Sequence, residues 1–354
     1  MIKTPVKILS TGIQLPQFSR TTDDILPYIE EWLLGQPKRL QDKVLRIFKY
    51  AEVDKRYSIM DIDEVFRESS FEEKNDFFIE KSIELSEGAL RKALARAELD
   101  PQDLDIIITV SCTGFMIPSV DAHLINRMRL RQNILRLPVT EMGCAAGVSG
   151  IIYAYEFLKA NPGKKAAVIA VESPTSTFQH RDFSMTNMVS AAIFGDGAAC
   201  TILGNSDRLL PAILDTEMYH FYDEIDMMGF RLRNTGLQMV LDPHVPDKIE
   251  KHFDQILLPF LHRNNIDIAD LQHFVFHPGG KKIVKITEEV LHAMGKHIDD
   301  TKAVLKEYGN MSSATVLYVL DRYLQKEMNA GDHGLMLSFG PGFSAQRVLL
   351  KWME

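Results

Sequence analysis

The two halves of the chain repeat one order of elements, and this repeat restricts the possible folds more than any other feature. Residues 99–110 and 266–277 each contain an Asp-x-x-Asp-Leu turn followed by an apolar strand, at an offset of 167 positions. Glu-Met-Gly-Cys, ending at Cys144, likewise corresponds to Glu-Tyr-Gly-Asn, ending at Asn310. A third match joins Phe-Gly-Asp-Gly at 194–197 to Phe-Gly-Pro-Gly at 339–342. Three matches in the same order indicate a duplicated α/β unit.

The duplication predicts an α/β fold with two sheets, each built from helix-linked strands. The unbroken apolar runs at 104–110 and 166–171 are typical of strands buried on both faces. Two such copies should pack against each other, with the helices that begin after Cys144 and Asn310 back to back in the core. We place the first half at 1–205, with the cysteine, and the second half at 206–354, with a histidine and the asparagine.

Cys144 follows a predicted strand at 135–142 and Gly143, and a helix rich in small residues begins directly after it. The backbone N–H groups at a helix start favour negative charge, which lowers the pKa of a thiol and makes it a nucleophile. A small residue packed in the core is the alternative, because free cysteine is among the most buried residue types.

His277 ends the predicted strand of the second half, so three strand ends carry a Cys, a His and an Asn facing one crevice. His277 can hold Cys144 as a thiolate, with a pKa of about 3.5–7.5 instead of about 8.5. His277 and Asn310 can both donate to an oxyanion, which suits acyl transfer, or decarboxylative carbon–carbon bond formation if the oxyanion is an enolate. A cysteine protease would use the same residue types, with the Asn orienting the His.

The overall composition excludes several other classes of protein. A net charge of −8 over 354 residues argues against a general nucleic-acid binder. Three cysteines are an odd count, so we expect no disulfide framework and a reducing cytoplasm. We expect no signal segment, no membrane span and no metal site, because the apolar runs are short and the histidines lack metal-ligand spacing.

Five motifs together resemble a known family: GCAAG around Cys144, HPGG at His277, YGNMSSAT at Asn310, FGDGAA at Phe194, and GPGF at 340–343. They are similar to the type III polyketide synthases, the chalcone synthase family, in a bacterial form. The resemblance covers about residues 6–352. It implies a thiolase-like, internally duplicated αβαβα fold, a homodimer, and a coenzyme A tunnel. It also implies iterative condensation of malonyl-CoA onto an acyl-CoA starter, with no cofactor.

The resemblance assigns roles by position. Cys144 becomes the acyl-bearing nucleophile, and His277 and Asn310 become its activators and the stabilisers of the enolate and the thioester oxyanion. Four further positions match the substrate cavity of the family: Cys112, Phe194, Met239 and Ser312. Phe194 matches one gatekeeper phenylalanine, whereas Met239 stands where plant members have the second.

Two departures from the plant pattern concern the starter pocket and the subunit interface. Phe230 replaces a Gly that shapes the starter pocket, and Ile117 stands where a Met crosses the interface between subunits. The segment that contacts the CoA phosphates in the family is basic here as well, with Arg46, Lys49, Lys55 and Arg56. A solvated helix face is the alternative explanation of that basic segment.

We expect a polyketide synthase that loads a fatty acyl starter and releases an alkylpyrone or a resorcinol-type ring, since the altered gate argues against an aromatic starter. A synthase of tetrahydroxynaphthalene from malonyl units alone is the nearest alternative, and Cys112 is compatible with it. An initiating β-ketoacyl-carrier-protein synthase and a degenerate, non-catalytic thiolase-fold module are the other two.

Overall fold

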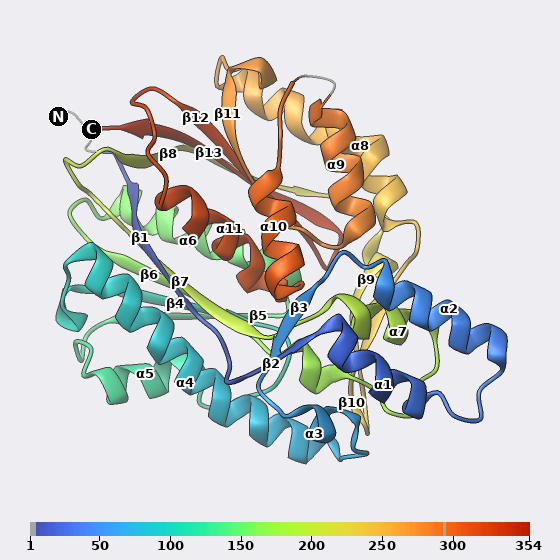
Figure 1. Ribbon diagram of the computed structural model, residues 1–354. Coiled ribbons are helices and arrows are strands. Elements are labelled where there is room, and N and C mark those ends of the chain that lie inside the picture. Colours follow the sequence, from blue (N-terminus) through green and yellow to red (C-terminus); the bar gives the residue numbers. More distant parts are fainter. Residues whose placement is uncertain (1–4, 293–294) are drawn as a thin grey trace.

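The computed structural model describes residues 5–292 and 295–354, and its centre is a nine-stranded sheet (Figure 1). The strands run across the sheet in the order β11-β12-β13-β8-β1-β7-β6-β4-β5. Their bounds are β1 Lys7–Gln14, β4 Ile106–Ser111, β5 Leu135–Thr140, β6 Ala166–Glu172, β7 Gly197–Gly204, β8 Leu210–His220, β11 Leu271–Phe276, β12 His333–Gly340 and β13 Ser344–Met353. Two small ladders are separate from it: β2 Phe18–Thr21 with β3 Lys55–Ser58, and β9 Met228–Arg233 with β10 Gly236–Leu241.

The two predicted sheets are present as two runs of strands, one from each half of the duplicated unit, and the two runs are joined edge to edge into one nine-stranded sheet. The run β4-β6-β7-β1 corresponds to β11-β12-β13-β8, and in each run the first pair is parallel and the remaining pairs are antiparallel. The two runs join where Lys7 of β1 pairs with Ala212 of β8, and where Ile213 N donates to Val6 O at 2.9 Å. An edge strand has backbone groups without hydrogen-bond partners. Here the edge strands of the two copies, β1 and β8, supply hydrogen bonds to each other.

Helices cover the sheet in layers (Figure 1). The bounds of the layered helices are α4 Phe71–Ala97, α5 Val120–Met128, α6 Ala146–Ala160, α8 Val245–Arg263, α9 Lys281–His292 and α11 Thr315–Leu324. The others are α1 Thr22–Trp32, α2 Lys38–Lys49, α3 Ile62–Phe66, α7 Met185–Ile193 and α10 Asp299–Tyr308. Helices α6 and α11 lie between the two runs of strands, α4 and α5 cover the first run from outside, and α8 and α9 cover the second.

Successive residues of β4 show how this layering buries a strand on both faces. Ile106 and Ile108 belong to the apolar cluster around α6 and α11, whereas Ile107 belongs to the cluster under α4 and α5. All three are at most 6% exposed. This alternation confirms the predicted five-layer, duplicated α/β architecture, because a strand between two helical layers needs apolar residues at every position.

The two central helices approach each other as closely as the duplication predicts. A Cβ atom added at Gly147, in the first turn of α6, would lie 2.2 Å from the carbonyl oxygen of Ser313, just before α11. The small residues after Cys144 therefore permit direct contact between the start of one central helix and the turn that leads into the other.

The helix starts follow local sequence signals. A capping box begins α4, since Ser70 Oγ accepts from Glu73 N at 3.1 Å and Glu73 Oε2 accepts from Ser70 N at 2.8 Å. The helix α4 is long, with 27 residues, but charged side chains occur along its whole length. Within the part of the chain that the structure describes, no helix combines the length and apolarity needed to cross a membrane.

Candidate active site

Three strand or helix ends meet at one pocket, which we call the catalytic pocket. Cys144 lies in a short turn just before α6, His277 directly follows β11, and Asn310 precedes the turn that leads into α11. All three side chains line the same cavity of about 720 Å³, its open mouth included. The remaining residues in its wall include Cys112, Phe194, Phe230, Met239 and Ser312, so the structure brings the predicted cavity residues together.

The turn that carries Cys144 is fixed by the loop between β12 and β13. Gly143 has φ of +51°, and a Cβ atom there would lie 2.5 Å from the ring of Pro341. Ser338 Oγ donates to the carbonyl oxygen of Cys144 at 2.7 Å. The Gly-Pro-Gly motif of the second half therefore packs directly on the nucleophile turn of the first half, which explains the glycine before Cys144.

The amide of Asn310 has one orientation that satisfies its neighbours. Its Oδ1 accepts from Ser312 N at 2.8 Å and from Thr315 Oγ1 at 3.3 Å, so the oxygen is the end that faces the backbone. Its Nδ2 donates to Gly279 O at 3.2 Å, and an amide nitrogen has a second N–H to offer. Asn310 thus presents a fixed donor at the wall of the pocket.

The Phe-Gly-Asp-Gly motif at 194–197, which is part of the third repeat match, lies against the turn that carries Asn310. Asn310 N donates to Ile193 O at 2.8 Å, and Gly195 N donates to Asn310 O at 3.1 Å. These bonds make a short parallel bridge between Asn310 and Phe194. The Phe-Gly-Asp-Gly motif therefore supports the asparagine turn and places the Phe194 ring in the wall of the pocket.

The His277 ring is buried without a hydrogen-bond partner. Only 6% of the residue is exposed, and neither Nδ1 nor Nε2 finds a partner among the described residues. Burial lowers the pKa of His277 to about 3, so the ring is neutral near pH 7. A neutral imidazole carries one N–H donor and one lone pair, and no group of the described residues uses either of them.

The prediction that Cys144 has a lowered pKa is wrong for this arrangement of the pocket. Burial raises the pKa of the Cys144 thiol to about 12, and the negative charge of Glu172 acts in the same direction. The thiol donates to Ser312 Oγ at 3.6 Å rather than to His277. Desolvation therefore raises the pKa of the thiol by more than the helix start lowers it, and the site holds a neutral thiol and a neutral imidazole.

Glu172 is a buried carboxylate beside the pocket that the sequence analysis missed. It ends β6, is fully buried, and accepts from Cys112 N at 3.0 Å, Thr113 Oγ1 at 2.8 Å and Ser313 Oγ at 2.5 Å. Burial raises its pKa above the ordinary value. The available signal was a single acidic residue at the end of an otherwise apolar strand, and it ties the segments after β4 and before α11 together.

Cys112 lies across Ser312 from Cys144. Its Sγ is 3.6 Å from Ser312 Oγ and 3.6 Å from both oxygens of Glu172. Burial, and then the charge of Glu172, raise the pKa of the Cys112 thiol well above its ordinary value. Cys112 is therefore a protonated thiol in the wall of the pocket near neutral pH.

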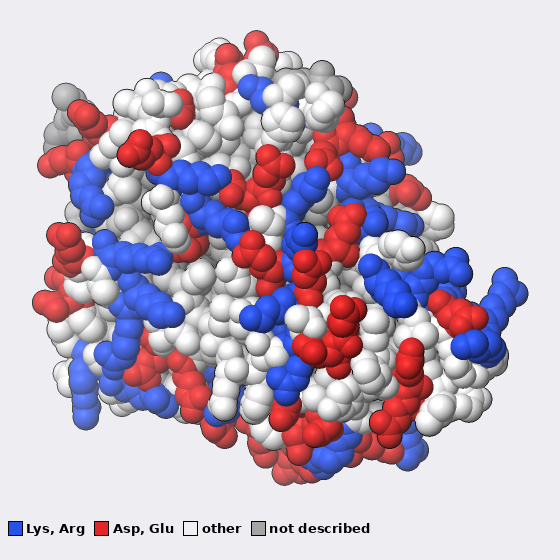
Figure 2. Space-filling model, viewed as in Figure 1, with Lys and Arg blue, Asp and Glu red and all other residues white. Residues whose placement is uncertain are grey.

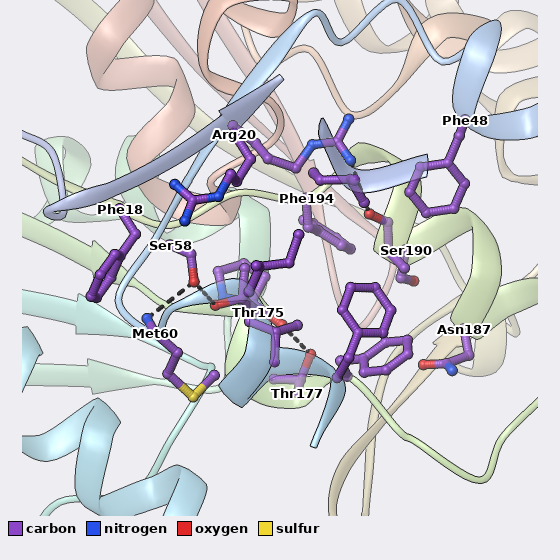
Figure 3. Close-up of a pocket in the computed structure, with 18 of the residues that line it drawn as sticks. Phe18, Arg20, Phe48, Ser58, Met60, Thr175, Thr177, Asn187, Ser190 and Phe194 are labelled. Atoms are coloured by element: carbon purple, nitrogen blue, oxygen red, sulfur yellow. Dashed lines mark hydrogen bonds between the residues drawn. The ribbon is translucent and has the colours of Figure 1, made fainter. Parts of the chain in front are cut away.

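A second apolar chamber adjoins the catalytic pocket, and the two share Pro174, Phe194 and Met239 as a common wall. Figure 3 shows the Phe194 ring among the labelled residues of this chamber. We call it the second chamber. Besides the shared wall it is lined by apolar residues, namely Phe18, Ile25, Phe48, Met60, Ile62, Val65, Phe66, Phe178 and Ala191, and by polar residues that include Arg20, Arg56 and Asn187. The two predicted gate residues thus separate two cavities.

The four predicted CoA-binding residues do not form one exposed group. Arg46 and Lys49 are exposed on α2, where basic side chains gather in the space-filling view (Figure 2), and Lys55 is half-buried in β3. Arg56 is only 5% exposed, and its guanidinium donates to Thr22 Oγ1 at 2.9 Å. Arg56 is therefore a structural residue between the start of α1 and β3, not a surface contact for phosphates.

Among the described residues, no group of three or more His, Cys, Asp or Glu side chains is placed to hold a metal ion. The chemistry of the pocket therefore has to be argued from the thiol, the imidazole, the amide and the buried carboxylate. A thiol nucleophile next to two neutral N–H donors suits a reaction that passes through an oxyanion.

Two family models match the chain. Residues 64–211 match the FAE1/type III polyketide synthase-like protein model, and residues 219–354 match the C-terminal domain of chalcone and stilbene synthases. The first match contains Cys144, and the second contains His277 and Asn310. The two halves of the catalytic pocket are therefore matched by two models of the same group of enzymes.

Individual relatives match nearly the whole chain. A putative chalcone synthase of Bacillus subtilis is 30% identical, with 98% of each chain covered. A 1,3,6,8-tetrahydroxynaphthalene synthase of Streptomyces peucetius is also 30% identical, with 99% of this chain and 94% of the relative covered. The crystal structure of 1,3,6,8-tetrahydroxynaphthalene synthase from Streptomyces coelicolor, a bacterial type III polyketide synthase, superimposes with a TM-score of 0.92 at 27% identity, covering 98% of this chain and 99% of that one.

Proposed function

The chain belongs to the type III polyketide synthase family, and we propose that it extends a fatty acyl starter with malonyl-CoA and cyclises the product to an alkylpyrone or a resorcinol-type ring. Members of this family are acyltransferases that form carbon–carbon bonds. The second chamber is the observation that supports the choice of a fatty acyl starter. The catalytic roles follow from the geometry of the pocket.

Loading begins at Cys144. His277 takes the thiol proton on its free ring nitrogen as the sulfur attacks the thioester carbonyl of the starter. It then returns that proton to the departing sulfur, so that CoA leaves as a thiol. Both pKa values favour the neutral pair at rest, so the proton transfer accompanies the attack. The N–H donors of His277 and Asn310 stabilise the thioester oxyanion.

Extension uses the same two donors. Malonyl-CoA loses CO2, and the negative charge moves to the thioester oxygen of the resulting enolate, where His277 and Asn310 donate hydrogen bonds. The enolate carbon then attacks the acyl group on Cys144, and the sulfur leaves as a thiolate. Neither donor is charged at neutral pH, so the enolate forms against fixed dipoles in a largely apolar pocket.

The second chamber supports an alkyl starter. Its wall is mostly aromatic and aliphatic, and it lies directly behind Phe194 and Met239, the two residues at the gate. Phe194 and the flexible Met239 can turn aside, because methionine has three rotatable bonds and adapts to irregular contacts. An alkyl chain attached to Cys144 could then extend through the gate and bury its apolar surface.

We also propose a homodimer that forms beside β4. The strand β5, which pairs with β4, is the edge of the sheet and leaves Leu135 53% and Leu137 37% exposed. Ile117, in the loop after β4, is 99% exposed. An edge strand with exposed apolar residues is a site where another chain can pack.

The choice of starter is tested by measuring products with malonyl-CoA and a series of acyl-CoA starters by mass spectrometry. We expect long-chain starters to give alkylated pyrones or resorcinols. In Val65→Trp, which fills the second chamber, we expect use of long-chain starters to fall about tenfold or more while short starters are retained, because the added ring occupies the space for the chain. Val65→Ile is the matched control.

Two results would redirect the proposal. A product from malonyl-CoA alone, with no effect of long-chain starters, would instead identify a synthase like the tetrahydroxynaphthalene-forming relatives. Extension only with malonyl on a carrier protein would identify an initiating β-ketoacyl synthase.

A further inference from the structure

Arg56 is a buried cation whose hydrogen-bond partners are all neutral. Only 5% of the residue is exposed. Its guanidinium donates to Thr22 Oγ1 at 2.9 Å, to Ala191 O at 3.4 Å and to Val53 O at 3.5 Å. Its Nε is buried and finds no acceptor among the described residues. Burial lowers the pKa of Arg56 to about 10, so the guanidinium still carries its positive charge near pH 7.

The other buried arginine of the described chain has the carboxylate that Arg56 lacks. Arg347 is 1% exposed, and its Nη2 lies 2.7 Å from a carboxylate oxygen of Glu217. No ion pair joins Arg56 to a carboxylate within the described ranges, and burial alone accounts for its lowered pKa. Ala191 O belongs to the last turn of α7, whose negative end offsets only about half an elementary charge. A buried charge without a counter-ion is costly, so an anion beside Arg56 would be stabilising.

Arg56 lines the second chamber, where the other polar side chains already have partners within the protein. The second arginine of this wall, Arg20, pairs with Asp61 at 2.8 Å. The remaining polar side chains labelled in Figure 3 are all hydrogen-bonded to neighbouring groups, namely Ser58, Thr175, Thr177, Asn187 and Ser190. Of the two arginines in the wall, only Arg56 has no carboxylate partner among the described residues.

We propose that the second chamber binds an apolar chain that ends in a carboxylate, with the carboxylate beside Arg56 and the chain against the aromatic and aliphatic wall. A planar guanidinium matches a carboxylate in shape as well as in charge. A single guanidinium without a counter-ion balances one negative charge, which favours a carboxylate over a doubly charged phosphate. The chain buries its apolar surface in the rest of the chamber.

The carboxylate site lies next to the gate between the two cavities. A Cβ atom added at Gly195, directly after Phe194, would lie 3.2 Å from the Cβ of Arg56. Two sources of the carboxylate fit this position. One is a free fatty acid held wholly within the second chamber. The other is an acyl starter on Cys144 that passes the gate and carries a second carboxylate at its far end; this source rests on the proposed function, whereas the first does not.

Binding of octanoate and of octanol tests the site without any turnover. We expect calorimetry to show that the wild type binds octanoate about tenfold more tightly, because its hydrogen bonds to Arg56 are charge-assisted. Without a cation in the wall the order would be reversed, since a carboxylate loses more hydration than a hydroxyl group. Arg56→Met removes the charge and should abolish the preference for octanoate.

Two controls separate the charge from the cavity and from the fold. Val65→Trp, which fills the second chamber, should weaken the binding of octanoate and octanol alike, whereas Val65→Ile should retain both. Thermal unfolding of Arg56→Met reports whether that variant folds. If it does not, the comparison of the two ligands on the wild type decides by itself. Equal or tighter binding of octanol by the wild type, or a preference for octanoate that persists in folded Arg56→Met, would overturn the proposal.

Turnover then distinguishes the two sources. Suberoyl-CoA and octanoyl-CoA have chains of equal length, and only the first ends in a carboxylate. A kcat/KM about tenfold higher for suberoyl-CoA, lost in Arg56→Met, would identify the starter as the source. Inhibition of octanoyl-CoA use by octanoate, with no preference for suberoyl-CoA, would identify a free fatty acid. If neither thioester is consumed, the proposed function fails while the binding measurements still decide the carboxylate site.

Discussion

The two turns that meet at the catalytic pocket have the same design and different chemistry. Gly143, with φ of +51°, precedes Cys144, and Gly309, with φ of +73°, precedes Asn310. In each half a short 3-10 turn leads into a central helix. The turn Gly143–Ala145 contains Cys144 and leads into α6, and the turn Ser312–Ala314 follows Asn310 and leads into α11. The duplicated backbone therefore fixes two positions that face one cavity, and a single side chain at each decides what that half contributes.

The two side chains also differ in how tightly they are held. Asn310 uses both ends of its amide, with three hydrogen bonds to neighbouring groups. Cys144 makes a long contact of 3.6 Å with Ser312 Oγ, and the Asn310 side chain is a second, weaker hydrogen-bond partner of its thiol. A fixed donor and a weakly held thiol suit their proposed parts, because an oxyanion donor should be preorganised whereas a nucleophile must leave its resting contact.

Among substitutions in the two turns, replacement of the nucleophile should have the largest effect on activity. Cys144→Ala should reduce starter loading and product to below detection, because no other thiol takes the place of Cys144 at the start of α6. Some release of CO2 from malonyl-CoA should remain, since His277 and Asn310 are intact. Radiolabelled starter bound to the protein, product by mass spectrometry, and labelled CO2 measure the three steps.

The matched control is Cys200→Ala, because Cys200 is buried under α4 in the outer cluster, away from the pocket. It should load and extend as the wild type does. Unchanged product yield in Cys144→Ala would contradict the assignment of the nucleophile.

Replacing the donor of the other turn should give a smaller, complementary loss. Asn310→Ala should lower the rate of malonyl-CoA decarboxylation by about 10²–10³-fold, the usual effect of removing one oxyanion donor. Starter should still be transferred to Cys144, more slowly. Loss of CO2 release by less than about threefold would show that Asn310 does not stabilise the enolate.

The smallest expected difference between the two turns is in their pH dependence, because the thiol of Cys144 can ionise whereas the amide of Asn310 cannot. The pKa of Cys144, raised to about 12 by burial, makes the thiolate fraction grow with pH, so alkylation of Cys144 by iodoacetamide should rise about tenfold per unit between about pH 6 and 9. Decarboxylation by Cys144→Ala should stay flat over that range, since His277, with a pKa of about 3, remains neutral.

A plateau of the alkylation rate below about pH 8 would instead show a preformed thiolate–imidazolium pair. Cys112 is a second thiol in the same pocket, so the measurement is made on Cys112→Ala with peptide mapping of the alkylated site. The raised pKa of Cys112 predicts that this substitution changes the total alkylation little.

Local signals were sufficient to predict the elements that carry the site. Ser70 and Glu73 form the capping box that begins α4, and the apolar run at 104–110 predicted a strand buried on both faces. Both depend on residues near one another in sequence. The order of three repeat matches then predicted that Cys144, His277 and Asn310 face one cavity, which the structure shows.

Properties that depend on distant neighbours could not be predicted in this way. The strand that begins at Leu135 was predicted, but its place at the exposed edge of the sheet was not. Arg56 looked like part of a basic surface but is covered by the start of α1. The role of Glu172 could not be predicted, because it depends on the backbone and hydroxyl groups that donate to its carboxylate from two other segments of the chain.

The sequence by itself determined the duplicated α/β unit and the three residues at its crevice, because periodicity and turn chemistry are local and the repeat supplies their pairing. The tertiary structure decided that the two copies share one sheet, that the thiol rests protonated, and that the gate residues separate two cavities. Each of these depends on desolvation or on pairing between segments far apart in the chain, which no single stretch of sequence contains.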